Sequence, residues 1–292
     1  GNLQQTRDSM LRNFFYGRPV FALELTIPHI GEEMSFYLAV PRRQSAAVEK
    51  VVQGIFPDAE VQRAGEYNIF NPTGASVGAY LKLSRNRYYP VRTYQKLEGD
   101  PMREITNVFT KLAREGEGAA LQIVARPARH KWQRKLRQHA KLFFEGKRPT
   151  HGVVRAVEMI SETVASPAPS SPDAQQKKMD SQKRITPLEE ELVRGLENKS
   201  SKALFETNIR LVASAASEDR AGAILQGLEL AFAQFTDPNS NSFIAERVST
   251  RGFRAFAFDF SFRAFAERKN AILASDELTS IFHFPNVPTE TP

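Results

Sequence analysis

The chain has 292 residues, of which 41% are hydrophobic and 25% charged, as in ordinary folded proteins, and its net charge is +7. It contains no cysteine, which excludes disulfides and thiolate metal ligands and fits a reducing, cytosolic compartment. The sequence has no run of 18 or more apolar residues and no N-terminal signal pattern, so we expect neither a membrane span nor a secretion signal within these residues. The excess of cations suggests an anionic partner, and where the cations lie matters more than their sum.

The first compact region is predicted at residues 20–128, after a lead-in at 1–19. Asp100 followed by Pro101 is a helix start, because Asp caps the first backbone N–H groups and Pro fits the first helical position. The order strand, helix, strand, strand, helix, strand, preceded by one extra strand, predicts a ferredoxin-like split βαβ domain of the α+β class. The expected elements are strands at Val20–Ile27 and Ser35–Val40, a helix from Ser45 that stops at Pro57, strands at Glu60–Ala64 and Ser76–Leu83, a helix from Asp100 to Gly116 and a strand at Ala119–Ala125.

A basic helix and a linker follow this region. The helix is expected at His130–Phe144, within a connector that spans residues 129–160. Residues 161–185 contain the run Ser-Pro-Ala-Pro-Ser-Ser-Pro and cannot bury enough apolar surface to become ordered. We therefore expect a disordered linker there.

A second, smaller α/β subdomain is predicted at residues 186–284. Thr186 and Glu189 form a capping box around Pro187, which indicates a helix that continues to about Lys199. Ser217 is the expected cap of a further helix. The other expected elements are a strand at Phe205–Ser214, a helix at Arg220–Phe235 and a strand at Phe243–Val248.

The phenylalanine-rich stretch 253–265 fits either a strand or a helix. Strict alternation over residues 256–262 favours a strand, whereas the wider spacing of the aromatic residues also fits a helix. In both cases a buried aromatic seam is favoured over a ligand site or a base-stacking platform.

The sequence lacks the P-loop and the common hydrolase and metalloprotease motifs. A P-loop needs Gly-x-x-x-x-Gly-Lys-Ser/Thr, and Gly74-Ala-Ser-Val-Gly78 lacks the Lys-Ser/Thr pair and enters a strand instead of a helix. There is no Gly-x-Ser-x-Gly elbow or His-Glu-x-x-His motif, and the five histidines are scattered. We expect no enzymatic activity, cofactor, metal site or small-molecule substrate for this chain.

The best candidate for a functional site is the cation-rich segment around the basic helix, because lysine and arginine side chains that neutralise phosphates give salt-dependent binding without sequence preference. Trp132 could stack on a base or anchor the helix to its domain. DNA, anionic lipid headgroups and solvent remain alternatives as the surroundings of this face. The candidate residues are Arg126, Arg129, Lys131, Arg134, Lys135, Arg137, Lys141, Lys147 and Arg148.

Several segments resemble the region that precedes the nucleotide-binding core in bacterial type IV secretion and conjugation ATPases of the HerA/FtsK type. The C-terminal run Asp276-Glu-Leu-Thr-Ser-Ile-Phe-His-Phe-Pro285 is similar to the approach to the motor domain in such chains. Others follow the same order along the chain: Phe36-Tyr-Leu-Ala-Val-Pro41, Phe56-Pro-Asp-Ala-Glu-Val61, Tyr67-Asn-Ile-Phe-Asn-Pro72, Tyr94-Gln-Lys-Leu-Glu-Gly-Asp-Pro101, Gly118-Ala-Ala-Leu-Gln-Ile-Val-Ala-Arg-Pro127, Phe205-Glu-Thr-Asn-Ile-Arg-Leu-Val-Ala-Ser214 and Phe232-Ala-Gln-Phe235.

The resemblance implies a non-catalytic assembly and docking module, with residues 285–292 as a tail that leads to an absent ATPase domain. It further implies a secretion or conjugation membrane complex as the partner, DNA as a candidate partner, and homo-oligomers formed through the ATPase domain. The implied location is the cytoplasm at the inner face of the cell membrane, held there by segments outside this chain. The alternative is a free-standing nucleic-acid-binding adaptor that uses residues 129–148, and a P-loop encoded soon after Pro292 would distinguish the first hypothesis from the second.

Overall fold

The computed structural model describes residues 18–30, 33–113, 115–144 and 187–284. The chain forms two compact units, one made of residues 1–128 and 202–292 and the other of residues 129–201. Each unit is described by itself below. The predicted linker at 161–185 and the predicted tail at 285–292 lie outside the described residues.

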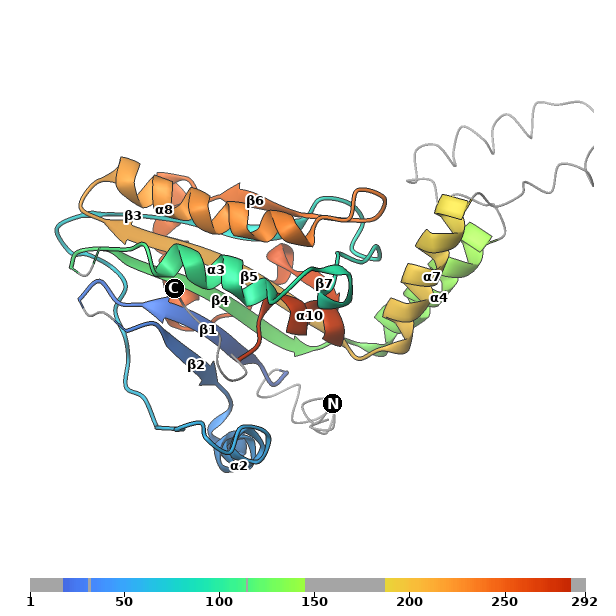
Figure 1. The fold of residues 1–292 in the computed structure, drawn as a ribbon, viewed down its shortest axis with the longest axis horizontal. Coiled ribbons are helices and arrows are strands. Elements are labelled where there is room, and N and C mark those ends of the chain that lie inside the picture. Colours follow the sequence, from blue (N-terminus) through green and yellow to red (C-terminus); the bar gives the residue numbers. More distant parts are fainter. Residues whose placement is uncertain (1–17, 31–32, 114, 145–186, 285–292) are drawn as a thin grey trace, which may run out of the picture. The chain divides into compact units, whose positions relative to one another are not determined.

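The larger unit contains one antiparallel sheet (Figure 1). Its strands come from the parts of the chain before and after residues 129–201. Its strand order is β2-β1-β4-β5-β3-β6, and β7 pairs with β5 beyond the end of β3. The strands are β1 (Phe21–Ile27), β2 (Ser35–Ala39), β3 (Ala75–Leu83), β4 (Gly118–Pro127), β5 (Leu204–Ala215), β6 (Phe243–Arg247) and β7 (Ala271–Ala274).

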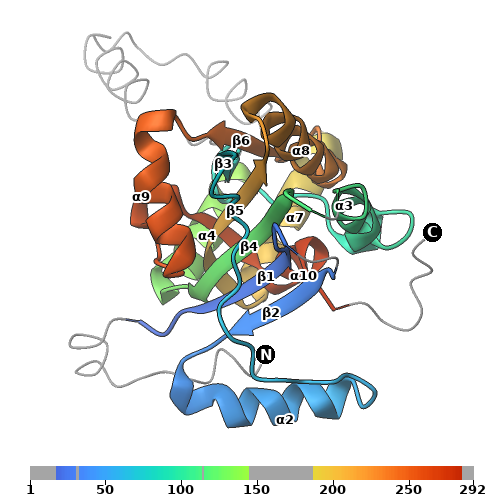
Figure 2. The same cartoon turned by 90° about the vertical axis from the view of Figure 1, so that its left-hand side faces the viewer.

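Helices cover both faces of this sheet (Figure 2). One face packs against α3, α8 and α10 over the larger apolar core, which includes Leu25, Leu211 and Phe232. The other face packs against α9 through Tyr80, Phe256 and Phe260. The helices of this unit are α2 (Ser45–Ile55), α3 (Pro101–Phe109), α8 (Glu218–Ala231), α9 (Thr250–Ser261) and α10 (Ser275–Ile281), with single 3-10 turns at Arg42–Gln44, Tyr94–Lys96, Phe232–Phe235 and Glu267–Lys269.

The predicted division into two separate subdomains does not match this sheet. β5, from the expected second subdomain, lies between β4 and β3 from the expected first one, and all twelve of its residues are buried. A strand that is buried on both faces needs pairing partners along its length, and β3, β4 and β7 supply them. The two stretches therefore complete one sheet together.

The predicted strand at Glu60–Ala64 is also wrong, because these residues have no regular secondary structure. The predicted ferredoxin-like arrangement within 20–128 is therefore not confirmed. The elements that do alternate are β3, α3, β4, β5, α8 and β6, in the sheet order β4-β5-β3-β6, and the smaller unit is inserted between β4 and β5.

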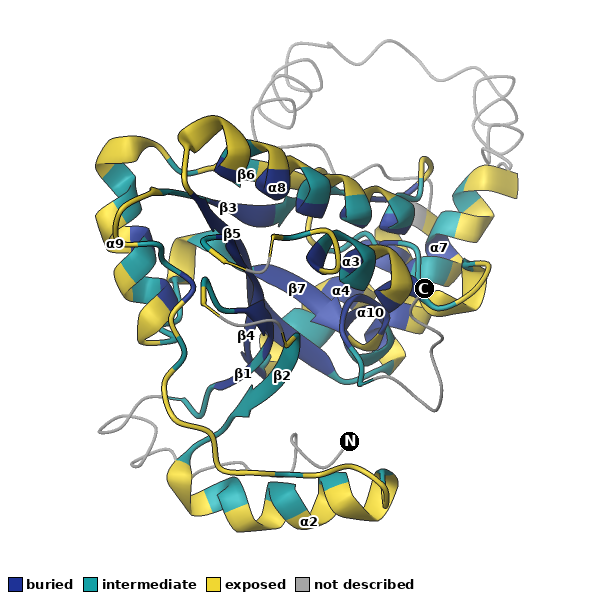
Figure 3. Ribbon diagram, turned by 60° about the vertical axis from the view of Figure 1, so that its left-hand side comes forward, coloured by how far each residue is buried: buried dark blue, intermediate teal, exposed yellow. Residues whose placement is uncertain are grey.

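The helix starts predicted from the capping residues Asp100 and Ser217 are confirmed. The Asp100 carboxylate accepts the backbone N–H of Met102 at 2.8 Å, and the Ser217 hydroxyl accepts that of Arg220 at 3.3 Å. Helix α2 also begins at Ser45 as expected, but its apolar residues are not buried, and Ile55 is 64% exposed (Figure 3).

Residues 250–261 form a helix, which settles the open choice for most of the phenylalanine-rich stretch. Phe256 and Phe260 lie one turn apart and face the sheet, whereas Phe258 and Phe262 point to solvent at 59% and 70% exposure. The helical period of 3.6 residues, not the alternation of two, therefore decides which rings are buried. A buried aromatic seam is confirmed for Phe256 and Phe260, and not for the exposed pair.

The C-terminal motif, which is the run from Asp276 to Pro285, joins three parts of the larger unit. The carboxylate of Glu277 accepts the backbone N–H of Ala274 at 2.7 Å and that of Val91 at 2.8 Å. The Ser280 hydroxyl accepts the N–H of Tyr94, and the ring of Phe282 contacts that of Phe36 on β2 at a centroid distance of 5.9 Å. This motif consequently stabilises the loop before α3 as well as the end of the described chain.

The smaller unit contains a pair of helices, α4 (His130–Phe144) and α7 (Pro187–Ser201), which pack against each other. Leu136 and Ala140 of α4 are buried, as are Val193 and Leu196 of α7. Helix α7 starts at the predicted proline. Among the helices of the described residues in both units, none is long and apolar enough to cross a membrane.

Candidate functional site

Helix α4 carries the cations that the sequence singles out. Its buried side holds Leu136, His139 and Ala140, which are spaced as one face of a helix. The remaining surface exposes five cations in under four turns, and Arg129, directly before the helix, is exposed as well. The exposed helical cations are Lys131, Arg134, Lys135, Arg137 and Lys141.

Trp132 lies among these cations and is half-buried. The ammonium groups of Lys131 and Lys135 each lie 5.6 Å from its ring centroid, a distance at which a cation is attracted to the face of an indole ring. The half-buried position is compatible with an anchor, and the nearby cations are compatible with stacking on a base. Both interpretations of Trp132 remain open.

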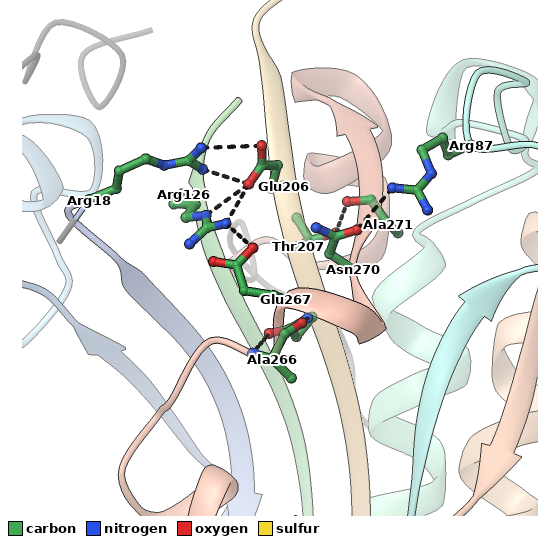
Figure 4. Close-up of polar contacts among 10 residues, drawn as sticks. Arg18, Arg87, Arg126, Glu206, Thr207, Ala266, Glu267, Asn270 and Ala271 are labelled. Atoms are coloured by element: carbon green, nitrogen blue, oxygen red, sulfur yellow. Dashed lines mark hydrogen bonds and ion pairs between the residues drawn. The ribbon is translucent and has the colours of Figure 1, made fainter. Parts of the chain in front are cut away.

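Arg126 does not belong to this exposed group, although the sequence places it next to the basic helix. It is only 8% exposed and lies on β4, where its guanidinium bonds to Glu206 at 2.9 Å and to Glu267 at 2.7 Å (Figure 4). Its charged group also lies 3.8 Å from the ring centroid of Phe265. With two carboxylates and an aromatic ring around it, Arg126 is engaged inside the protein and is not available to a phosphate.

Glu206 is the centre of this ion-pair cluster. Its carboxylate also accepts two bonds from Arg18, at 3.2 and 2.6 Å, so that it lies between two guanidinium groups (Figure 4). Burial opposes the charge of Arg126, but the bonds to Glu267 and Glu206 outweigh it and raise the pKa of Arg126. Lys147 and Arg148, the last two candidate cations, lie outside the described residues.

A second polar cluster crosses the face of the sheet that α9 covers. The strand register aligns Glu24, Gln122, Arg210 and Tyr80 in one row across β1, β4, β5 and β3. The Gln122 amide donates to Glu24 at 2.7 Å, and Arg210 donates to the amide oxygen of Gln122 at 2.7 Å. Glu24, Gln122 and Arg210 are all fully buried. The row is therefore a continuous chain of polar contacts inside the core.

The turn after α9 completes this row. Arg263 donates two bonds to the Glu24 carboxylate, at 2.9 and 2.8 Å, and adopts a positive φ of 53°, which is uncommon for a residue with a side chain. Arg210 also donates to the carbonyl of Ala264. These bonds attach the turn to β1 and to β5, so the polar row fixes the end of α9 on the sheet.

The cluster perturbs the groups within it. Tyr67 lies beside this row, with its ring centroid 5.9 Å from the guanidinium of Arg263. Burial and then the Glu24 carboxylate raise the pKa of Tyr67 well above its ordinary range, and burial lowers the pKa of Arg210. Such shifts also occur at catalytic sites, but here Glu24 is fully buried and is bonded to both Gln122 and Arg263. We therefore assign the cluster to stability.

Sequence reasoning missed both clusters, although a signal was present. In the second cluster, the polar residues interrupt apolar strands, as in Leu23-Glu24-Leu25, Leu121-Gln122-Ile123 and Ile209-Arg210-Leu211. A charged residue in such a run indicates a buried pair, but the partner could be identified only from the pairing of the strands.

No group of three or more histidine, aspartate or glutamate side chains suited to a metal ion occurs within residues 18–30, 33–113, 115–144 and 187–284. A family model described as "Domain of unknown function (DUF8128)" matches residues 14–292. Among curated proteins, none matches the chain.

Proposed function

We propose that this chain, which belongs to the DUF8128 family of domains of unknown function, is a non-catalytic docking module of a DNA-translocating ATPase of the type IV secretion and conjugation kind. The ordered series of similar segments, from Phe36-Tyr-Leu-Ala-Val-Pro41 to the C-terminal motif, supports the link to such motors. The proposed partners are the secretion or conjugation membrane complex and DNA, with oligomers formed through an ATPase domain outside these residues.

The observation that carries the proposal is the exposed cationic surface of α4. Five lysine and arginine side chains of this helix face solvent, and the helix belongs to a unit inserted between two neighbouring strands. The cations of α4 are therefore not part of the sheet and can bind a partner. Sequence-independent attraction to DNA phosphates is the chemistry that such a surface supplies.

We also propose that β3, α3, β4, β5, α8 and β6 correspond to a ferredoxin-like core. The sheet order β4-β5-β3-β6, with antiparallel pairing throughout, supports this correspondence. It differs from the arrangement predicted from the sequence, because its first three elements precede residues 129–201 in the chain and its last three follow them.

The test is salt-dependent binding of the full chain to a random-sequence DNA duplex, measured by fluorescence anisotropy. With five phosphate contacts, the affinity should fall roughly 500-fold between 50 and 200 mM salt. The triple variant Arg134→Glu, Lys135→Glu, Arg137→Glu should lower the slope of log affinity against log salt by about 2.7, because about 0.9 is lost for each contact removed.

The matched control reverses three exposed cations of the larger unit, at Lys50, Arg103 and Lys111. It changes the net charge of the chain by the same amount, so a general charge effect would appear in both variants. Unchanged DNA binding by the α4 variant, or an equal loss in the control, would overturn the assignment of α4.

The runner-up is a free-standing nucleic-acid-binding adaptor, which the same exposed cations favour. Both functions predict the same DNA binding by α4, so the anisotropy measurement does not separate them. A P-loop encoded after Pro292 supports the docking module, and a stop codon supports the adaptor.

A further inference from the structure

The sheet has a step at its β6 edge. β6 pairs only with Ala79–Leu83 of β3, although β3 begins at Ala75. The last bond of this pairing runs from the N–H of Val248 to the carbonyl of Gly78 at 2.8 Å, and the chain then enters α9. The first residues of β3 consequently have β5 on one side and no described strand on the other.

The alternation of a strand identifies which backbone groups face this open side. Because the Gly78 carbonyl points toward β6, the N–H and C=O of Ser76, two residues earlier, point to the same side. Val77 lies between them and directs its backbone groups toward β5. A further strand could therefore pair with Ser76 on the edge of β3 opposite β5, where β6 does not reach.

A cleft of about 450 Å³ lies at this step, between the start of β3, the end of β6 and one side of α8. Val77 and Gly78 line it from the sheet, and Gly222 and Ala223 line it from the helix. A Cβ atom placed on Gly222 would meet no other heavy atom within 4 Å, so the cleft is open in front of that residue. Small residues on the helix leave room for an extended chain beside the strand.

The charges around the cleft select the kind of chain. Glu218 and Asp219 line it from the first turn of α8, are exposed and form no ion pair with any described residue. The cation that lines it, Arg247, already donates two bonds to the Glu229 carboxylate, at 2.9 and 2.8 Å. The uncompensated charge of the lining is therefore negative, and a basic segment complements it.

We propose that this cleft binds an extended, basic peptide segment of a partner protein, which adds to the sheet as a strand beside β3. Backbone bonds to Ser76 would supply affinity, and a lysine or arginine side chain against Glu218 and Asp219 would supply specificity. The site lies in the larger unit and uses none of the cations of α4. It is thus a second docking surface, of opposite charge to the proposed DNA contact.

The experiment measures binding of the full chain to two labelled octapeptides of alternating sequence, Val-Lys and Val-Glu, by fluorescence anisotropy. The basic peptide should bind at least 10-fold more tightly than the acidic one. The double variant Glu218→Gln, Asp219→Gln should remove most of this difference. Equal binding of the two peptides to the unchanged protein would overturn the proposal.

Filling the cleft tests the location. Gly222→Gln places a side chain into open space on a helix and should weaken binding of the basic peptide at least 10-fold without loss of folding. Gly54→Gln is the matched control, because Gly54 is also a helical glycine with no heavy atom near its Cβ position, on α2 away from the cleft. Equal affinities of these two variants would contradict the assignment.

Amide hydrogen exchange separates strand addition from simple charge attraction. Saturating basic peptide should slow exchange at the Ser76 amide, which faces the open side, and leave the Val77 amide, which faces β5, unchanged. If the peptide binds without protection of Ser76, it does not add as a strand, and the proposal fails.

Discussion

At the scale of single residues, the buried charges of the larger unit depend on one another. Glu24 lies fully buried between Gln122 and Arg263, and the same row continues to Arg210. Taking ions out of water costs several kcal/mol for each, and only well-placed partners offset this cost. Removing one member leaves the others without compensation.

The variant Glu24→Gln should therefore destabilise the protein by roughly 3–5 kcal/mol, because the fully buried Arg210 loses a nearby carboxylate and Arg263, whose side chain is 34% exposed, loses its ion pair. The measurement is the free energy of unfolding in urea. Glu229→Gln is the control, since its partner Arg247 is 53% exposed and such a pair contributes about 0–1 kcal/mol. Equal losses in both variants would show that burial of the row does not matter.

Arg126 shows why the candidate site could be predicted only in part. In the sequence it is three residues from exposed Arg129 and looks like the start of one basic segment. Its surroundings come from Glu206 and Glu267, which are 80 and 141 residues away. The exposure of the five helical cations could be expected from their local pattern, whereas partners so distant in the chain could not.

At the scale of elements, α4 and α7 depend on a small apolar contact, and each helix also buries one basic residue, His139 and Lys199. His139 of α4 is 8% exposed, and burial lowers its pKa below the ordinary value of 6.5. The unfolded helix takes up a proton near pH 6.5, but the packed helix takes it up only at a lower pH. Stability is therefore fully present above pH 6.5 and is lost as the pH falls from 6.5 toward the lowered pKa.

We expect the amides of α4 to exchange faster at pH 5.5 than at pH 7.5, after correction for the intrinsic pH dependence of exchange. His139→Leu should abolish this difference, because no group then charges on unfolding. His130→Gln on the same helix should retain it, since His130 is exposed. A pH effect that persists in His139→Leu would assign it to another group.

The elements themselves were easier to predict than their pairing. Caps at Asp100 and Ser217 and the apolar spacing of the helices depend on neighbours in the chain, so they could be read locally. β5 has the same apolar pattern whether it lies at an edge or in the centre of a sheet. Its place between β4 and β3 is decided by contacts between residues roughly 80 to 140 positions apart, which no local pattern contains.

At the scale of the whole molecule, the smaller unit is an insertion into a sheet that closes without it. The N–H of Ala128 donates to the carbonyl of Leu204 at 2.8 Å, so the chain leaves and re-enters the larger unit at adjacent positions. β4 and β5 pair along their length up to that point, from Gly118 opposite Ser214 to Pro127 opposite Phe205.

Replacing residues 129–201 with Asn-Gly, a pair that favours tight hairpin turns, should therefore leave the sheet folded. We expect a single cooperative thermal transition and loss of DNA binding. The far-ultraviolet circular dichroism spectrum should keep its β-sheet signal. The full chain is the reference for each measurement. If the shortened chain does not fold, the helices contribute to the sheet; if it still binds DNA, the contact lies elsewhere.

The same insertion sets the order in which the protein can be assembled during its synthesis. At 5–20 residues per second, β5 leaves the ribosome roughly 4 to 15 s after β4, because the two helices and the stretch between them are made first. During that interval the edge of β4 that pairs with β5 has no partner. The backbone groups of an unpaired apolar edge can pair with another chain, which leads to aggregation. β1, which is made earlier, pairs with its other edge. The charged helix α4 is made directly after β4, during the interval in which this edge has no partner.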